Sequence, residues 1–578
     1  MHWILRSCAL VALSVLSCAL RAQAGKADAD AVKVLDEWVG QYQQGQLDVS
    51  MRERLRGKAY QAKNFVSIKR GVVRADRANR LTYEGELRLL CDEVAKRNDE
   101  AAAQALLKVA SVGLTGKALD MALVPSVVRA VGEEFAAKLT SGEALAVLTA
   151  TARGEGGRGG ARQAAALRVL AKNTQGAQRE LIEQMVGHAQ ADVRMAAASA
   201  LGIAAQPASA HVLGDRLGVE PDERVAMSLV DALTATVVAA GAKVPAGDLS
   251  AALDAGIAAY EKHGWRYQIA ALDFFAAARS PRTVPILIET LARYHGKSSP
   301  PSGDRFSGMV PERAHRVLQN LTKCIFAEDR PDQWQEWWKE NEATLQVAAS
   351  TEPLKLERVN AGAAGTVANS FFGIPVAGSR VVFVVDISGS MMFPLVRKGA
   401  TSIDDQYSSK WELARTELHT AIDKLGADSS FNVVFFSTDA DPWKPKLVSA
   451  SPGNKKAFFA YLDKVHPNGG TNVWAALRAA LNPKSSDPTV RIAGDVDEIF
   501  LLSDGLPSVG DVVDPNHILQ TVQSVNEVSR VRLNTIYIGG DEEAEARRTR
   551  GRGPQWDMDG PEFMSRLATQ NHGQFLHP

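Results

Sequence analysis

A short run of oxygen-bearing side chains, Asp386-Ile-Ser388-Gly-Ser390, follows directly after the apolar segment Val381–Val385. An apolar run of this length is typical of a buried strand, so the turn would stand at the carboxyl edge of a sheet. Carboxylate and hydroxyl oxygens suit a hard divalent cation such as Mg²⁺, whereas sulfur and imidazole do not. A structural role is the alternative, because serines can satisfy the backbone of a turn and Asp386 can cap a following helix.

Signatures of other chemistries are missing from the sequence. There is no HExxH motif, and the eleven histidines show no zinc-like spacing. Gly296-Lys297-Ser298 resembles the end of a phosphate-binding loop, but position 291 holds Leu and no strand precedes it. No GxSxG motif occurs, and no paired carboxylates or nucleophile stand out in the N-terminal half. We therefore predict that the protein is not an enzyme.

The elements that would position the oxygen-bearing turn alternate between strand and helix in the C-terminal part of the chain. This alternation predicts a doubly wound α/β domain, in which helices wrap a parallel sheet and ligands bind at the carboxyl ends of the strands. Strands are expected at Val381–Val385, Asn432–Ser437, Glu498–Leu502, Leu533–Ile538 and Gln574–Leu576. Helices are expected at Trp411–Leu425, from Val473, from His517 and at Glu562–Thr569.

Two further loops carry oxygens at corresponding places. Asn468-Gly-Gly-Thr471-Asn precedes a predicted helix, and Leu501-Leu-Ser-Asp504-Gly follows a predicted strand. Together with the Asp-x-Ser-x-Ser run, these loops make residues 371–578 resemble a von Willebrand factor type A (Rossmann-like) domain with a metal-ion-dependent adhesion site. One such loop would be weak support, but three in this order are specific.

The resemblance implies five metal ligands, of which the two carboxylates would bind directly or through water. The hydroxyls would supply neutral oxygens and the two carboxylates the negative charge, so a bound Mg²⁺ would stay electron-poor and attract an Asp or Glu of a protein partner. Mn²⁺ or Ca²⁺ are alternative ions. Against this, Thr471 could cap its own helix, and Asp504 could belong to an ordinary turn. The implied ligands are Asp386, Ser388, Ser390, Thr471 and Asp504.

Two insertions enlarge the predicted domain. Residues 391–409 separate the first loop from its helix, and they would form part of the binding face or a lid beside the metal. Residues 541–559 carry acids followed by four arginines, which could contact an anionic partner or form a solvated loop.

The N-terminal region, residues 25–346, is rich in Ala, Leu and Val at helical spacing. A repeat is visible in it, because similar Ala-rich segments surround Arg162, Arg194, Arg224 and, more loosely, Arg266. Each unit resembles a HEAT-type repeat, which implies an all-α solenoid that offers a second interaction surface. A plain Ala-rich helical bundle is the alternative.

The repeat region is expected to close with a helix that carries Trp334, Trp337 and Trp338 on one face. This spacing is ordinary for a core, so we interpret the helix as a cap that shields the end of the solenoid. An aromatic platform for a glycan or a peptide is the functional alternative.

Residues 1–24 are predicted to be a signal peptide. Arg6 supplies a positive start, Cys8–Leu20 is apolar but short, and Ala22-Gln23-Ala24 fits a cleavage site. We therefore expect export to the periplasm, the cell envelope or the extracellular space. A lipobox-like sequence that ends at Cys18 leaves a lipid anchor at that cysteine as an alternative.

Composition adds constraints to this picture. Lys plus Arg and Asp plus Glu both number 66, so no overall charge draws the chain to nucleic acid or an anionic membrane. No transmembrane segment follows the signal peptide, and Cys91 and Cys324 could pair or stay free. The predicted multidomain organisation is a signal peptide (1–24), a helical repeat domain (25–346), a linker (347–370) and a type A domain (371–578).

We therefore expect an exported binding or scaffold protein that recognises a protein partner through Mg²⁺. A non-catalytic subunit of a larger envelope enzyme or transport assembly is the alternative.

Overall fold

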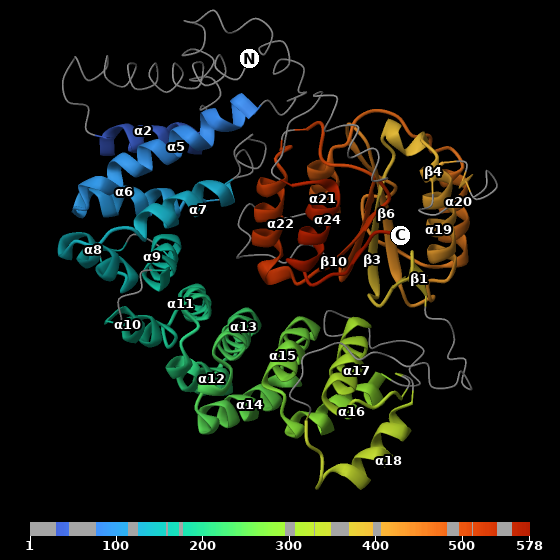
Figure 1. Cartoon of the computed structure of the whole chain (residues 1–578), viewed down its shortest axis with the longest axis horizontal. Helices are drawn as coiled ribbons and strands as arrows, with labels where there is room; N and C mark the ends of the chain where they lie inside the picture. Colours follow the sequence, from blue (N-terminus) through green and yellow to red (C-terminus); the bar gives the residue numbers. More distant parts are fainter. Residues whose placement is uncertain are drawn as a thin grey trace, which may run out of the picture.

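The chain folds into an N-terminal arc of helices that curves around a C-terminal α/β domain (Figure 1). The structure, a computed structural model of the whole chain, describes residues 31–44, 77–113, 125–155, 157, 160–172, 177–294, 307–326, 328, 330–347, 369–396, 406–407, 409–481, 496–510, 512–539 and 558–578. The predicted signal peptide with Cys18 lies outside the described residues, as do most of the predicted linker and of the 541–559 insertion.

The helices of the arc form two layers. In one layer α9, α11, α13, α15 and α17 pack side by side in chain order, and α8, α10, α12, α14 and α16 cover them from the other side. The all-helical N-terminal region is thus confirmed. Its helices are α2 (Ala31–Gln43), α5 (Arg77–Arg97), α6 (Glu100–Ala110), α7 (Pro125–Ala136), α8 (Gly142–Ala152), α9 (Gly160–Lys172), α10 (Ala177–Met185), α11 (Ala191–Ala204), α12 (Ala210–Val219), α13 (Glu223–Ala240), α14 (Ala246–Tyr260), α15 (Trp265–Ala278), α16 (Val284–Tyr294), α17 (Met309–Thr322) and α18 (Pro331–Asn341).

Small residues allow neighbouring helices of the arc to approach closely. A Cβ at Gly132 would lie 2.4 Å from the backbone nitrogen of Ala110, and one at Gly214 would lie 3.0 Å from the Cα of Ala252. Side chains larger than hydrogen at these two positions would push the helices apart. Small residues at these contacts therefore permit the short distances between the helices.

The last helix of the arc, α18, buries Trp334 completely. The indole packs edge-on against the rings of Phe326 and His315. Trp337 and Trp338 are only partly buried and pack against the same core. This packing is typical of a helix that covers the end of the core. The buried Trp334 is not available to an exposed aromatic binding surface.

The C-terminal domain is built on a mixed, mostly parallel sheet with the strand order β11-β10-β9-β3-β6-β7. Neighbouring strands from β11 to β6 are parallel, and β7 and β8 pair antiparallel with β6. This confirms the predicted α/β fold. The strands are β1 (Ser370–Phe371), β2 (Ile374–Pro375), β3 (Arg380–Asp386), β4 (Leu395–Val396), β5 (Gln406–Tyr407), β6 (Ser430–Phe436), β7 (Ala440–Pro442), β8 (Val448–Ser449), β9 (Glu498–Ser503), β10 (Arg532–Tyr537) and β11 (Phe575–Leu576).

Both faces of this sheet are covered. Along β3, Val382 and Val384 join the core on the side of the helical arc, while Val381, Phe383 and Val385 join the core on the other side. Burial on both faces explains why the strand is a continuous apolar run rather than an alternating one. The helices are α19 (Lys410–Asp423), α20 (Pro452–Leu462), α21 (Val473–Leu481), α22 (Pro515–Ser529) and α24 (Gly560–Thr569), and Figure 1 shows α19 and α20 on one side of the sheet and α21, α22 and α24 on the other.

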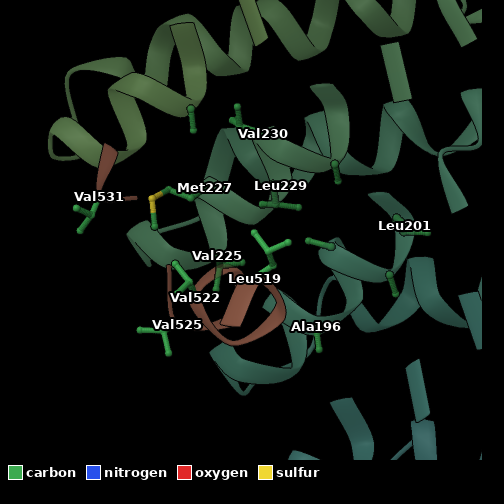
Figure 2. Close-up of a cluster of buried hydrophobic side chains, with 14 of the residues drawn as sticks. Ala196, Leu201, Val225, Met227, Leu229, Val230, Leu519, Val522, Val525 and Val531 are labelled. Atoms are coloured by element: carbon green, nitrogen blue, oxygen red, sulfur yellow. The ribbon is translucent and has the colours of Figure 1, made fainter. Parts of the chain in front are cut away.

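The apolar core of the helical arc continues into the α/β domain through α22. Figure 2 shows Leu519 and Val522 of α22 beside Val225 and Leu229 of α13, with Ala196 of α11 nearby. All five side chains are buried and belong to one apolar cluster. The two regions therefore share a hydrophobic core.

Polar contacts tie the arc to the amino-terminal edge of the sheet. Arg532, at the start of β10, pairs with Glu312 of α17 at 2.8 Å. Arg266 of α15 donates from Nε to the carbonyl oxygen of Ser529 at 3.0 Å, and Arg530 pairs with Asp231 of α13. These contacts lie at the end of the strands opposite to the carboxyl edge.

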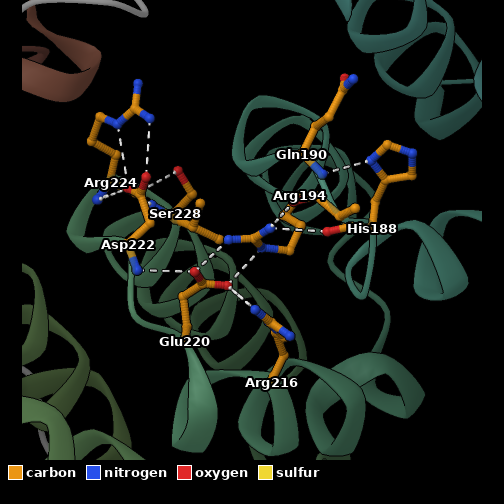
Figure 3. Close-up of polar contacts among 10 residues, drawn as sticks. His188, Gln190, Arg194, Arg216, Glu220, Asp222, Arg224 and Ser228 are labelled. Atoms are coloured by element: carbon orange, nitrogen blue, oxygen red, sulfur yellow. Dashed lines mark hydrogen bonds and ion pairs between the residues drawn. The ribbon is translucent and has the colours of Figure 1, made fainter.

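A second polar network joins neighbouring helices inside the arc (Figure 3). Arg194 donates to both carboxylate oxygens of Glu220, at 2.8 and 2.7 Å, and to the carbonyl oxygens of His188 and Ala189. Burial opposes the charge on Glu220, but hydrogen bonds from Arg194 and Arg216 hold the pKa of Glu220 below its ordinary value. Arg194 of α11 thus fixes a connection to Glu220, which follows α12.

Further findings concern the membrane and the thiols. Within the described residues, no helix has both the length and the apolar character needed to span a bilayer. Cys91, which is buried in α5, and Cys324, which follows α17, are both free thiols.

Candidate metal centre

The first loop of the candidate site begins where β3 ends. Because β3 and β9 pair in parallel register up to Val385 and Leu502, the next residues emerge side by side at the carboxyl edge. Ser503 Oγ donates to Asp386 Oδ2 at 2.6 Å, and the backbone nitrogen of Ser388 donates to Oδ1 at 2.7 Å. The end of β9 and the loop after β3 therefore each fix one oxygen of this carboxyl group.

Asp386 has no exposed surface. Its burial and the negative charge of Asp504 raise the pKa of Asp386 to about 7, although hydrogen bonds from Ser503 and Ser388 act against this rise. The neighbours of Asp386 thus do not compensate its charge. A cation brought to this edge of the sheet would do so.

The two serines of the first loop connect the two carboxylates. Ser388 Oγ lies 3.1 Å from Ser390 Oγ, and Ser390 Oγ donates to Asp504 Oδ1 at 2.9 Å. Ser388 and Asp504 are each 2% exposed. Four of the five predicted ligands, Asp386, Ser388, Ser390 and Asp504, therefore belong to one hydrogen-bonded cluster.

The other oxygen of Asp504 contacts a cationic side chain. Lys410 Nζ donates to Asp504 Oδ2 at 2.9 Å, and the side chains of the two residues are 2% and 0% exposed. Lys410 is the first residue of α19, and its backbone nitrogen donates to the carbonyl oxygen of Phe393. The lysine thereby reaches the site from the far end of the 391–409 insertion.

Thr471, the fifth predicted ligand, lies on a second loop that is bonded to the other two. Gly389 N donates to the carbonyl oxygen of Gly469 at 3.1 Å, which joins the first loop to the second. Thr471 N donates to Ser508 Oγ at 2.9 Å, and Ser508 N donates back to the carbonyl oxygen of Thr471 at 2.9 Å. The helix that follows, α21, is capped by Asn472. Thr471 is thus not needed as the cap.

Glycine is required at one point of this second loop. Gly469 has a φ of +83°, and a Cβ on it would lie 2.8 Å from Thr438 Oγ1. The left-handed backbone and the close approach both exclude a larger residue without strain. This fit brings the second loop against the loop that follows β6.

The donor set of the cluster fits a hard cation. Within the described residues, no group of three or more His, Cys, Asp or Glu side chains could hold a metal ion. The cluster instead offers two carboxylates and several hydroxyls, the mixture of oxygens that Mg²⁺ accepts while it keeps some water. The five predicted ligands would hold the ion, and its positive charge would compensate the buried carboxylates.

Sequence reasoning missed three residues that shape the site. Ser503 precedes Asp504 in the third loop, and its position at the strand end could have indicated a contact with Asp386. Ser508 and Lys410 gave no comparable signal, because neither lies in a recognisable motif. Their roles depend on how the loops fold against one another.

Parts of the 391–409 insertion are described, and two short strands in these parts pair with each other. Leu395 pairs antiparallel with Tyr407, and Val396 pairs with Gln406. Met392 and Phe393, just before this pairing, are more than half exposed beside the first loop. The hairpin returns the chain to the site, where α19 begins.

Comparison with known proteins shows that part of this domain matches a family model. Residues 379–546 match the family model of the von Willebrand factor type A domain. Inter-alpha-trypsin inhibitor heavy chain H4 from Bos taurus is 32% identical over 146 residues, which is 25% of this chain and 14% of that protein. The human protein of the same name is 30% identical over 177 residues, 29% of this chain and 17% of that protein. The matches thus span less than a fifth of these relatives.

Solved structures also match part of this chain. The PilB minor pilin from Streptococcus sanguinis matches 34% of this chain and 56% of that chain, with 18% sequence identity and a TM-score of 0.25.

Proposed function

We propose that the protein is an exported, non-catalytic binding protein that recognises an acidic side chain of a protein partner through Mg²⁺ at the candidate metal centre. The observation that carries this proposal is the hydrogen-bonded chain from Asp386 through Ser388 and Ser390 to Asp504. These hydrogen bonds bring buried carboxylates and hydroxyls together at the carboxyl edge of the sheet, where ligands bind in such folds. A bound Mg²⁺ would supply a Lewis-acidic position for the carboxylate of the partner.

The helical region contributes to the proposed binding role by holding the α/β domain in a fixed position. We propose that it is a HEAT-like solenoid whose inner side holds the α/β domain through α22 and the amino edge of the sheet. The candidate centre lies at the opposite, carboxyl edge. The contact with the solenoid and the binding of a partner would therefore use opposite edges of the same sheet.

The partner class follows from the type A domain and from the charge of the site. A metal ion held largely by neutral hydroxyls keeps part of its positive charge, which favours an Asp or Glu from outside. The match to the type A family model and the partial similarity to inter-alpha-trypsin inhibitor heavy chains support a binding role. Export through the predicted signal peptide is part of the proposal.

The proposal is tested by calorimetric titration of Mg²⁺ into the mature protein, into Ser388→Ala and into Asp504→Asn. We expect saturable binding by the unmodified protein and at least a tenfold loss of affinity in each variant. Asp463→Asn is the matched control, because Asp463 is an exposed acid of the same domain. Equal Mg²⁺ affinity in all four proteins would overturn the proposed site.

A further inference from the structure

We propose that the ammonium group of Lys410 is a permanent positive charge of the candidate metal centre. It lowers the affinity of the site for Mg²⁺, and it gives the metal-bound site a net positive charge that attracts an acidic side chain of a partner. This inference rests on the proposed function, because it assigns a further residue to the same site. It starts from the contact between Lys410 Nζ and Asp504 Oδ2 at 2.9 Å.

The burial of this ion pair shows that the contact is a fixed part of the fold. The side chains of Lys410 and Asp504 are 2% and 0% exposed. A buried ammonium is unfavourable unless it is paired, and removing one partner of such a pair leaves the other charge uncompensated. Asp504 is thus bound on both sides, through Oδ2 to Lys410 and through Oδ1 to Ser390.

The backbone holds Lys410 in place as well. Ser409 caps α19 by accepting a hydrogen bond from Glu412 N at 3.1 Å, and Lys410 N donates to the carbonyl oxygen of Phe393 at 3.0 Å. Phe393 follows directly on the turn that carries Ser390. The first turn of the helix is therefore joined to the metal loop, and the backbone of Lys410 has a fixed position beside the site.

Charge balance gives the pair its functional consequence. In the described cluster, Asp386 and Asp504 contribute two negative charges and Lys410 one positive charge. A divalent ion added to two carboxylates would leave the site without net charge, so a third carboxylate would be attracted only by the residual positive charge on the ion itself. With Lys410 present, the loaded site carries one positive charge, which matches one Asp or Glu of a partner.

The same charge acts against the metal before a partner arrives. An ammonium that contacts a ligand oxygen repels an incoming cation and occupies one oxygen of Asp504. A lysine that acted only by holding the loops in place would have the opposite effect, because its removal would disturb the ligands and weaken metal binding. The two roles therefore differ in the sign of the effect on Mg²⁺ affinity.

The test is a calorimetric Mg²⁺ titration of the mature full-length protein and of Lys410→Met, with thermal melts of both in EDTA and in Mg²⁺. We expect Lys410→Met to bind Mg²⁺ about tenfold more tightly or better, to melt earlier in EDTA, and to show a larger stabilisation by Mg²⁺. Lys410→Arg retains the charge and should keep an affinity close to that of the unmodified protein. Lys424→Met removes an exposed lysine from the end of the same helix and is the matched control.

The outcomes separate this inference from the proposed function. Equal or weaker Mg²⁺ binding by Lys410→Met, with binding by the unmodified protein intact, overturns the role of Lys410 alone. An absence of Mg²⁺ binding in both proteins overturns the proposed site and the inference together. If Lys410→Met does not fold, Lys410→Gln takes its place and is judged by the same criterion.

Discussion

Two clusters of buried charge, one in each region of the molecule, have opposite electrostatic character. In the helical arc, Glu220 is surrounded by two arginines, and its pKa lies below the ordinary value despite its burial. At the candidate metal centre, burial and a second carboxylate raise the pKa of Asp386 to about 7. The first cluster is balanced and holds helices together, whereas the second is unbalanced and is suited to binding a cation.

The two clusters also differ in how the chain builds them. Arg194 and Glu220 are 26 residues apart and join two neighbouring helices of the arc. Asp386 and Ser503 are 117 residues apart and meet because parallel strands end at the same edge. A pair between neighbouring helices needs two segments that are close in the sequence, but a site at the edge of a sheet needs several segments that are farther apart.

The largest expected effect concerns the balanced cluster. Arg194→Met would leave Glu220 buried with a single arginine, and we expect it to lower the free energy of unfolding by about 3 kcal/mol. Mg²⁺ affinity should not change, because the site lies in the other region. Urea unfolding and calorimetry measure the two quantities. A loss below about 1 kcal/mol would show that Arg216 alone compensates Glu220.

The next effect concerns the unbalanced cluster. Asp386→Asn removes a buried charge, so at pH 8 in EDTA the variant should be at least as stable as the unmodified protein. At a Mg²⁺ concentration 100 times the dissociation constant, the unmodified protein should gain about 2.7 kcal/mol that the variant lacks. Thermal or urea unfolding in both conditions measures this. Lower stability of the variant in EDTA would contradict the description of Asp386 as an uncompensated charge.

A smaller effect is expected where the two regions meet. His517 of α22 contacts Glu84 of α5 at 3.0 Å, and this hydrogen bond, together with Arg88, lowers the pKa of Glu84 to about 2. A lowered pKa stabilises the fold above the unfolded value of 4.5, and this contribution is lost as the pH falls from 4.5 through 2. Glu84→Gln should therefore cost roughly 1–2 kcal/mol at pH 6 and nothing near pH 2.

The measurement for Glu84 is urea unfolding of both proteins between pH 2 and pH 6. Glu93→Gln serves as the control, because Glu93 is an exposed acid of the same helix that pairs with Lys96. A constant difference between Glu84→Gln and the unmodified protein across this range would show that the contact with His517 does not depend on the charge of Glu84.

The smallest effect is expected on the surface of the arc. Arg282 pairs with Asp254, and both side chains are exposed. Because water screens such pairs, Arg282→Met should change the free energy of unfolding by less than about 1 kcal/mol. Urea unfolding beside Arg194→Met gives the comparison directly. A similar loss in both variants would remove the distinction between buried and exposed arginines.

The sequence by itself determined the order of the elements and the three loops of the candidate site. Strands such as Val381–Val385 could be predicted because a strand buried on both faces is continuously apolar, which is a local property. The helical arc could be predicted for the same reason, since its periodicity is local. The strands β7 and β8 were missed, because they are short, and β7 ends in a proline without an apolar pattern.

Only the tertiary structure decided which partners the site residues have. Lys410 and Asp504 are 94 residues apart, and no local pattern relates a helix start to a turn after a distant strand. The occupation of the inner side of the arc by α22 is likewise a property of two surfaces that fit together. Local periodicity reports which face of an element is buried, while the identity of the neighbour depends on long-range packing.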